Sequence, residues 1–310
     1  MVISATNRQM SYFLFNGIFR SSAVGRMIAL VILTLAVSVN ALGEYSDEFT
    51  RKFMFPLSAA AYSDRPQFCV KNLFPNSTVY HQVTVKCDSK TESTCSGYTA
   101  VLHAQKAIVI SFRGTARFHQ LLEEAKKTVF IDWKRWVFGG RVSTYFYDAF
   151  LRIWNSGMSG DFLMLTRKYP NYEIWVTGHS LGGSLASLAA SFVVGSGFAK
   201  TKNTKLVTLG QPRTGDLVFA IAHHTQIEYA FRVVHWRDIV PHLPFGKEFG
   251  YRHHRQEVFY KRGMNPGEFV VCKGNEEREC SNGLYFASSI KDHTHYFGQQ
   301  VSTYGINGCV

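Results

Sequence analysis

A serine between two glycines stands near the middle of this 310-residue chain. Residues 178–182 read Gly-His-Ser-Leu-Gly, with Ser180 at the centre, and Gly183 extends the run. The pattern is typical of a nucleophilic serine when a strand precedes it and a helix follows it, because the sharp turn exposes the hydroxyl and leaves no room for neighbouring side chains. Inert turns can carry the same five-residue pattern. The flanking segments therefore decide whether Ser180 is interpreted as a nucleophile or as an inert turn residue.

The segments on both sides of Ser180 have the required character. Residues 173–177, Glu-Ile-Trp-Val-Thr, predict a strand, and the small and apolar residues from 181 to 194 predict a buried helix. The positive end of that helix would face Ser180, and the backbone N–H of Leu181 would donate to an oxyanion. We therefore interpret Ser180 as a nucleophile.

A nucleophilic serine needs a base to take its proton and an acid to orient the base. In this type of site the acid follows the serine and precedes the histidine. Asp238 is the preferred acid because it follows the apolar residues 231–235, at the end of a predicted strand where open sheets form their sites. Asp216 is instead predicted to cap the start of a helix. The alternative for Asp238 is a solvent-exposed aspartate in a loop without a catalytic role. The acids considered are Asp216, Glu228, Asp238 and Glu248.

The base must be one of the histidines late in the chain. His293 lies within residues 290–296, far enough along to reach back from another element. His295 would share its face, so spacing alone leaves these two open. The candidates are His242, His253, His254, His293 and His295.

Strand-like and helix-like segments alternate around these residues. Residues 107–110, Ala-Ile-Val-Ile, are apolar on both faces, which is typical of central strands in a mostly parallel sheet covered by helices. We found neither internal repeats nor a long linker, so we expect a single domain over residues 44–310. Strands are predicted at 106–112, 173–177, 205–209 and 229–235, and helical spacing covers 148–169 and 181–194.

Residues 1–43 differ from the rest of the chain. They contain arginines but no acidic residue, then an apolar run over 27–39 and Ala-Leu-Gly at 41–43, which predicts a cleaved signal peptide and export. Two alternatives stay open, namely a signal anchor that is not cleaved and a translation start at Met27 instead of Met1. After cleavage we expect no stable membrane span. The full chain has a globular composition, with 46% apolar and 18% charged residues.

All six cysteines lie beyond the predicted signal peptide, and an even number in an exported chain indicates three disulfides. Six cysteines allow 15 pairings, and spacing only hints at two short bridges with a long one left over. No C-x-x-C pair occurs, so a metal site is not expected. The suggested pairs are Cys87 with Cys95, Cys272 with Cys280, and Cys69 with Cys309.

Charge and one sequon bear on location and partners. Asn76 begins the only Asn-x-Ser/Thr sequon, which predicts a glycosylated surface loop in an exported chain. The formal net charge is +12, of which the three arginines of residues 1–43 supply three. The protein beyond residue 43 is therefore still basic, and its positive charge would attract it to anionic phospholipid surfaces. No nucleic-acid partner is expected, because no basic cluster alternates with aromatic residues.

Five motifs in a fixed order resemble those of the class 3 lipases, whose best-known members are small secreted fungal triacylglycerol lipases. The resemblance spans roughly residues 100–300. It implies an α/β-hydrolase fold, with a mostly parallel central sheet flanked by helices and a lid segment. The matching motifs are Ile110-Ser111-Phe112-Arg113-Gly114-Thr115, residues 177–183, 210–215 and 237–242, and Asp292-His293.

The resemblance implies a role for each matching position. Ser180 resembles the nucleophile, Asp238 the acid and His293 the base, since residues 292–297 match Asp-His-x-x-Tyr-Phe. The backbone N–H of Thr115 resembles the second oxyanion donor beside that of Leu181. The implied reaction is hydrolysis of lipid esters through an acyl-enzyme, with no metal or organic cofactor.

The segment that follows Thr115 occupies the place of the family's lid. It predicts an amphipathic helix whose Phe118, Leu121 and Leu122 would cover an acyl groove, with a fixed surface helix as the alternative. The family layout also supports a Cys272–Cys280 bridge and a bond between the two ends of the mature chain. Its remaining small bridge is spaced differently, so the pairing of Cys87 with Cys95 depends on spacing.

We expect the partner to be a lipid ester at an oil–water or membrane interface. The same catalytic set would also serve a phospholipase A-type enzyme or a general carboxylesterase, and the fold alone would serve an inactive lipid-binding relative. An intact set of Ser180, Asp238 and His293 favours the enzyme. Acyl chain length and oligomeric state are left open.

Overall fold

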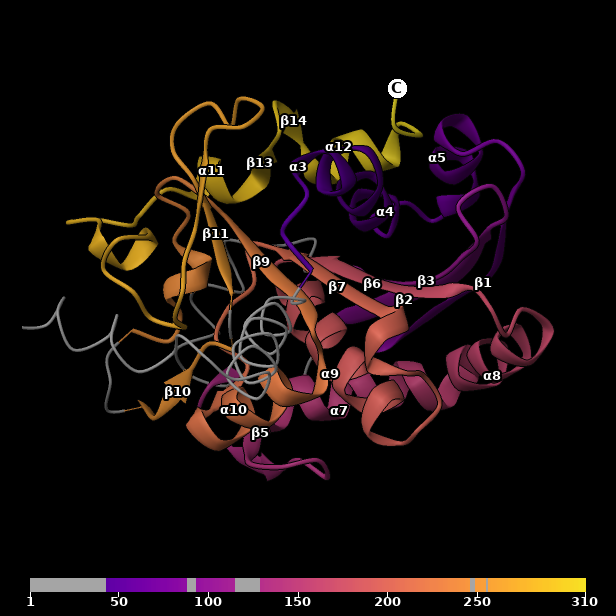
Figure 1. The fold of residues 1–310 in the computed structure, drawn as a ribbon, viewed down its shortest axis with the longest axis horizontal. Helices are drawn as coiled ribbons and strands as arrows, with labels where there is room; N and C mark the ends of the chain where they lie inside the picture. The colour runs from indigo at the N-terminus through magenta and orange to yellow at the C-terminus, as the bar shows by residue number, and fades with distance from the viewer. Residues whose placement is uncertain (1–42, 88–92, 115–128, 246–248, 255) are drawn as a thin grey trace, which may run out of the picture. The chain divides into compact units, whose positions relative to one another are not determined.

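The computed structural model describes residues 43–87, 93–114, 129–245, 249–254 and 256–310. Within these residues the main sheet has eight strands in the order β1-β2-β3-β6-β7-β9-β11-β12 (Figure 1). From β3 to β11 neighbouring strands are parallel, whereas the β1, β2 and β12 edges are antiparallel. The strands are β1 Ser77–Lys86, β2 Thr94–Leu102, β3 Ala107–Phe112, β6 Glu173–His179, β7 Thr204–Leu209, β9 Tyr229–His235, β11 Glu257–Tyr260 and β12 Phe269–Val271.

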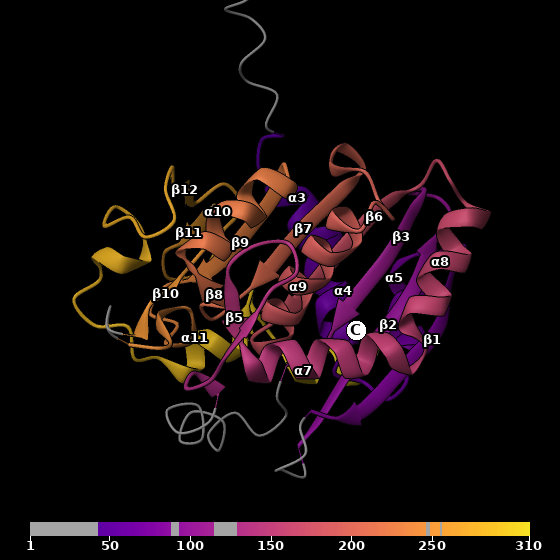
Figure 2. The ribbon, with the colours of Figure 1, turned by 90° about the horizontal axis from the view of Figure 1, so that it is seen from below.

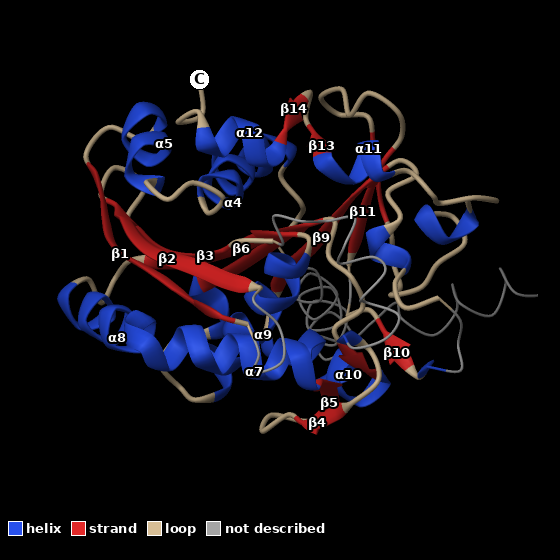
Figure 3. Cartoon of the chain, turned by 180° about the vertical axis from the view of Figure 1, so that it is seen from behind, coloured by secondary structure: helices blue, strands red, loops and turns tan. Residues whose placement is uncertain are grey.

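Helices cover both faces of this sheet (Figure 3). On one face lie α3 Asp47–Phe49, a π-helical turn Thr50–Met54, α4 Phe55–Ala60, α5 Pro66–Leu73 and α12 Val301–Ile306. On the other lie α7 Thr144–Ile153, α8 Ser159–Lys168, α9 Leu181–Gly195 and α10 Leu217–Gln226, which stand in front of the strands in Figure 2. The short helix α11 Ile290–Thr294 follows the last sheet strand.

Two small sheets complete the described part of the fold. One has four strands in the order β10-β8-β5-β4, and the other pairs β13 with β14. Their strands are β4 Trp133–Arg135, β5 Arg141–Ser143, β8 Gly215–Asp216, β10 Tyr251–Arg252, β13 His295–Tyr296 and β14 Gln299–Gln300.

The central strands are buried on both faces, as their apolar runs predicted. In β3 every residue is buried, with Ile108 and Ile110 in the core under α7 and α9 and Val109 in the core under α4 and α12. This alternation arises because successive strand side chains point to opposite faces. The predicted strands in β3, β6, β7 and β9 are confirmed, each within two residues at either end.

The segment 148–169, whose spacing predicted helical structure, is helical as far as Lys168 but does not form one regular helix. A π-helical turn, Trp154–Met158, separates α7 from α8, and within it Gly157 has φ +129°. Gly157 adopts this left-handed backbone where the ring of His81 on β1 lies close, since an added Cβ would be 3.1 Å from its Cε1. Phe150 and Phe162 stay buried on either side of the break, which explains why the apolar spacing continues.

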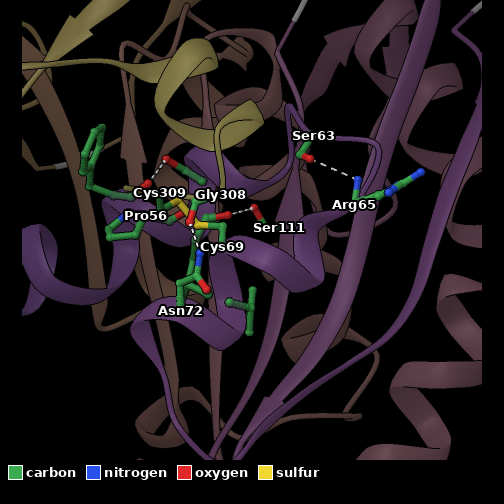
Figure 4. Close-up of a disulfide and its surroundings, with 12 residues drawn as sticks. Pro56, Ser63, Arg65, Cys69, Asn72, Ser111, Gly308 and Cys309 are labelled. Atoms are coloured by element: carbon green, nitrogen blue, oxygen red, sulfur yellow. Dashed lines mark hydrogen bonds between the residues drawn. A yellow bond between two sulfur atoms is a disulfide. The ribbon is translucent and has the colours of Figure 1, made fainter.

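Three disulfides join all six cysteines in the pairs named from the sequence. Cys69 on α5 and Cys309 after α12 are 240 residues apart in the chain (Figure 4). Asn72 strengthens the same junction, since its side-chain nitrogen donates to the carbonyl of Gly308 at 2.8 Å. The chain end is thereby held against α5, close to the C label in Figure 1.

Several expectations fall outside the described residues. They concern the signal peptide, of which only Gly43 is described, the oxyanion donor Thr115, and the lid residues Phe118, Leu121 and Leu122. Among the helices that are described, none has the length and apolar character needed to cross a membrane. Asn76 is exposed at the start of β1, as a glycosylation sequon requires.

Candidate active site

Ser180 lies in a sharp turn between β6 and α9. Its backbone has φ 60° and ψ −132°, a conformation that is costly for any residue with a side chain and that is found mostly at functional sites. Two glycines make the turn possible. A Cβ on Gly178 would overlap the carbonyl oxygen of Gly182, and a Cβ on Gly182 would overlap that of Phe112. The turn thus has the strand, serine and helix of a nucleophile elbow.

The hydroxyl of Ser180 is buried and has no hydrogen-bond partner among the described residues. Leu181 directly follows it and begins α9, a helix of 15 residues. The first N–H groups of a helix have no partner within the helix and carry its positive partial charge, so they can stabilise a negative oxygen beside Ser180. On the other side the described chain stops at Gly114, one residue before Thr115.

Asp238 and His293 come from distant parts of the chain and meet in the interior. The Nδ1 of His293 lies 2.9 and 3.0 Å from the two carboxylate oxygens of Asp238, and the side chains are 1% and 0% exposed. Since a carboxylate only accepts hydrogen bonds, Nδ1 of the neutral ring carries the proton, and Nε2 is left to take another. The ring stacks on His179, the residue before Ser180, with 4.6 Å between centroids. His293 is therefore held beside the elbow.

Backbone contacts fix the distance between these two segments. Asp238 follows β9 and forms a parallel bridge with Ser289, whose hydroxyl also accepts from the Asp292 N–H and caps α11. The Asp292 carboxylate accepts in turn from the Arg237 N–H at 3.1 Å. The short helix that carries His293 is thus tied to the loop that carries Asp238 at two points.

The Asp238 carboxylate is stabilised in its charged form. Burial alone would raise its pKa, but the charge of His293 and hydrogen bonds from His293, Tyr296 and Val240 outweigh burial and lower it. The Tyr296 hydroxyl donates to Oδ2 at 2.6 Å, and the Val240 N–H donates to Oδ1 at 2.9 Å. An anion with these partners can both orient an imidazole and stabilise the imidazolium.

The structure separates the two histidines that spacing left open. The ring of His295 is turned toward α11, where its Nδ1 contacts Thr294 Oγ1 and the carbonyl of Lys291, each at 3.0 Å. Only His293 of the two reaches Asp238. Tyr296 was missed as a site residue, although it occupies a fixed position of the motif Asp-His-x-x-Tyr-Phe and supplies a hydroxyl to Asp238.

The other candidate acids and bases that are described have structural partners or lie apart. Asp216 caps α10 by accepting from the Phe219 N–H at 2.9 Å, as predicted, and Glu228 is exposed. His253 donates from Nε2 to the carbonyl of Pro241 at 2.7 Å. Of the remaining candidates, His254 is buried with its Nε2 3.1 Å from Gln211 Nε2, His242 is partly buried, and Glu248 is outside the described residues.

Ion pairs beneath the Asp238 loop hold its continuation in place. Arg213 makes two hydrogen bonds to the Glu276 carboxylate, at 3.0 and 2.8 Å, and a third to the carbonyl of His242 at 2.6 Å. Glu276 is partly buried, yet these bonds and the charges of Arg213 and His253 lower its pKa. The loops after β7 and β9 are thereby joined to the segment that contains the Cys272–Cys280 bridge.

One group of described residues has atoms close enough to hold a metal ion, namely Glu257, Cys272 and Cys280. The two sulfurs form a disulfide with each other. Metal ligation by cysteine requires a thiolate, so this group does not form a metal site.

Comparison with known proteins shows similarity to lipases. Residues 109–248 match the family model "Lipase (class 3)". A protein named Lipase ZK262.3 from Caenorhabditis elegans is 33% identical over 320 residues, which cover 90% of this chain and 89% of that protein. A Rhizopus niveus lipase is 35% identical over 208 residues, and there the match covers 66% of this chain but 51% of the relative.

Solved structures show the same fold. Lipase II from Rhizopus niveus superposes with a TM-score of 0.71 at 27% identity, covering 83% of this chain and 97% of that one. A Rhizomucor miehei triacylglyceride lipase gives a TM-score of 0.70 at 28% identity, with coverage of 84% and 97%. The sheet and helices described above are accordingly an α/β-hydrolase fold. The chain belongs to the class 3 lipase family.

Proposed function

We propose that this protein is a secreted serine hydrolase that cleaves carboxylic esters of lipids, with Ser180 as nucleophile, His293 as base and Asp238 as the acid that orients it. The observation that carries the proposal is the buried contact between His293 and Asp238 beside the strained turn of Ser180. A solved relative, 28% identical and with a TM-score of 0.68, is a triacylglycerol lipase whose catalytic centre is a serine protease triad.

In the proposed reaction Ser180 Oγ attacks the ester carbonyl while His293 Nε2 takes the hydroxyl proton. Asp238 stabilises the imidazolium, and the N–H groups of Leu181 and Thr115 stabilise the oxyanion. Collapse of the tetrahedral intermediate breaks the ester C–O bond, and His293 gives its proton to the leaving alcohol. Water then attacks the acyl-enzyme with the same proton transfers and frees the fatty acid and Ser180.

We propose triacylglycerol as the leading substrate, reached through a lid formed by Phe118, Leu121 and Leu122. Mono- and diacylglycerol are the second candidates. They are favoured by a relative from Fusarium solani named as a secreted mono- and diacylglycerol lipase, which is 30% identical over 75% of this chain. The reaction requires neither metal nor organic cofactor, because the serine, histidine and aspartate supply the nucleophile and the proton transfers.

Export is part of the proposal. It is supported by the predicted signal peptide in residues 1–43, by three disulfides, and by the word "secreted" in the names of relatives from Fusarium solani and Penicillium cyclopium. Disulfides persist in oxidising compartments and are rare in the cytosol. Glycosylation at the exposed Asn76 is expected in the same compartment.

The test is hydrolysis of emulsified triacylglycerol, diacylglycerol, phospholipid vesicles and a soluble short-chain ester, measured side by side. Ser180→Ala is expected to abolish every activity and to prevent labelling by a fluorophosphonate. Ser187→Ala is the matched control, because Ser187 is a fully buried serine of α9, the helix that begins directly after Ser180. Cleavage of the soluble ester alone would replace the lipase assignment by a general esterase, and absence of a Ser180 adduct in folded protein would contradict the hydrolase.

A further inference from the structure

His179, the variable position of the Gly-His-Ser-Leu-Gly run, has two partners that the proposed reaction does not use. It is 3% exposed. Its Nδ1 lies 2.7 Å from the hydroxyl of Tyr62, and its Nε2 lies 2.7 Å from the backbone carbonyl of His293. Its ring also stacks on the ring of His293, at an interplanar angle of 28°. His179 therefore touches the base through both its ring and its Nε2.

The direction of these hydrogen bonds follows from the partners. A carbonyl only accepts, so Nε2 of His179 carries the hydrogen and donates to His293 O. Nδ1 of the neutral ring then accepts from the Tyr62 hydroxyl. Burial and the neighbouring His293 lower the pKa of His179 to about 3, so the ring is neutral at the pH where His293 would act.

Tyr62 extends the chain of hydrogen bonds to the far side of Ser180. Its oxygen accepts from the backbone N–H of Gly114. The hydroxyl lies so close that a Cβ on Gly114 would overlap it, and the same Cβ would be 3.0 Å from the Cβ of Ser180. Gly114 directly precedes Thr115, the proposed second oxyanion donor.

We propose that Tyr62 and His179 are a pair of positioning residues, which hold the base and the oxyanion loop at a fixed separation on opposite sides of Ser180. The hydrogen-bonded chain runs from Gly114 N–H through Tyr62 and His179 to His293 O. This inference rests on the proposed function, because it gives Tyr62 and His179 a role only through Ser180 and His293.

Two physical reasons make this more than ordinary core packing. The carbonyl of His293 lies in the last turn of α11, where helical carbonyls have no partner within the helix. The hydrogen bond from His179 to this carbonyl therefore fixes the position of the His293 backbone relative to Ser180. In addition, a hydrogen bond into Nδ1 of His179 keeps its lone pair occupied. The ring of His179 is thereby kept neutral, and it does not repel the positively charged imidazolium that His293 becomes during the proposed reaction.

The test compares Tyr62→Phe, His179→Phe and His179→Gln with Tyr98→Phe on a soluble ester. Tyr98 is the matched control, since its fully buried hydroxyl donates to the carbonyl of Leu57 at 2.7 Å, away from the site. Tyr62→Phe is expected to lower kcat roughly 10- to 100-fold with KM nearly unchanged, because a small misplacement of the reacting groups costs about that much. Tyr98→Phe is expected to lower the melting temperature only.

The His179 pair distinguishes positioning from packing. His179→Phe keeps a flat ring but removes the donor, and it is expected to lose at least as much kcat as Tyr62→Phe. His179→Gln restores an N–H that can reach His293 O, so it is expected to recover most of that loss. The double variant Tyr62→Phe with His179→Phe should be no worse than His179→Phe, because both changes break one chain.

Active-site titration with a fluorophosphonate counts competent molecules and separates this proposal from the function on which it rests. A wild-type enzyme without activity or Ser180 labelling would contradict the proposed function. An active wild type with kcat per titrated site unchanged in Tyr62→Phe, or equally reduced in Tyr98→Phe, would overturn the positioning role alone. Equal losses in His179→Gln and His179→Phe would do the same.

Discussion

Gly210 lies directly against the ring of His293: a Cβ on Gly210 would be 2.9 Å from Nδ1 of that ring and 2.8 Å from Oδ2 of Asp238. Gly210 follows β7 and has φ +58°. The contact between His293 and Asp238, the proposed base and acid, therefore depends on a residue that has no side chain and no proposed role in the chemistry. Its N–H donates to the carbonyl of Val233 at 2.9 Å, which prevents it from moving away.

Gly210→Ala is expected to displace the His293 ring and to lower kcat/KM on a soluble ester by about 100-fold or more. Gly197→Ala is the matched control, because Gly197 has φ +73° and open space around it. Both variants should lose about 1 kcal/mol of stability from the left-handed backbone. Full activity in Gly210→Ala, with stability matched to Gly197→Ala, would contradict the steric argument.

Tyr296→Phe is expected to lower kcat by roughly 10- to 100-fold, the cost of losing a hydrogen bond to a buried charged group. The hydroxyl donates to Asp238 at 2.6 Å, and both residues are fully buried. Steady-state kinetics on a soluble ester measure the effect, with Asp238→Asn as the more severe reference. An unchanged kcat would mean that the remaining bonds from His293 and Val240 suffice.

Stability is expected to fall as the pH drops from about 7 toward 3. Burial lowers the pKa of His179 and of His223 to about 3, whereas an unfolded histidine has a pKa of about 6.5. Between these values the unfolded chain binds more protons, so each such histidine removes up to ~1.4 kcal/mol per pH unit. Chemical denaturation between pH 7 and pH 5 measures this slope, before carboxylates titrate.

The variant His223→Leu checks the assignment of that slope. His223 is fully buried, so the substitution removes one titrating group. The absolute stability will change, but the slope against pH should become shallower by about one proton. A slope that stays the same would show that other groups cause the acid sensitivity.

Arg232→Met is expected to destabilise the fold by roughly 3–5 kcal/mol, because it leaves the buried Glu257 carboxylate without its cation. Arg232 Nη1 lies 3.7 Å from Glu257 Oε2, and the side chains are 0% and 5% exposed. Adding Glu257→Gln should recover part of the loss, since the amide oxygen can still accept from the Ser281 N–H. Denaturation of the single and double variants measures this coupling, and strictly additive losses would contradict it.

Much of the site could be predicted because its chemistry is local in sequence. The glycines around Ser180 specify the turn. The strand before it and the helix after it are predicted by the local sequence patterns of residues 173–177 and 181–194. Asp238 was predicted from its place after an apolar strand. The selection of His293 over His295 needed the family motif, because which histidine reaches Asp238 depends on the contacts of Ser289 with Asp238 and of Asp292 with Arg237.

Other features could not be predicted because they depend on tertiary contacts. The break between α7 and α8 occurs where Gly157 meets His81 of a different element. The strand β1 contacts the core with Val83 while most of its residues are partly or fully exposed, so it lacks the continuous apolar run of β3. The roles inferred for Tyr62 and Gly210 come from positions 117 and 83 residues away from their partners His179 and His293, a relation that no local pattern contains.

The bond between Cys69 and Cys309 has a consequence for biosynthesis. The ribosome makes Cys309 240 residues after Cys69, which takes roughly 10 to 50 seconds at ordinary elongation rates. Throughout that interval the native partner of Cys69 is not yet made, and Cys87 and Cys95 are the next cysteines in the chain. We expect the Cys87–Cys95 bridge, which spans only eight residues, to close first and so to remove both competitors. The short bridge would thereby protect the long one during oxidative folding, in addition to anything it contributes to the stability of the finished protein.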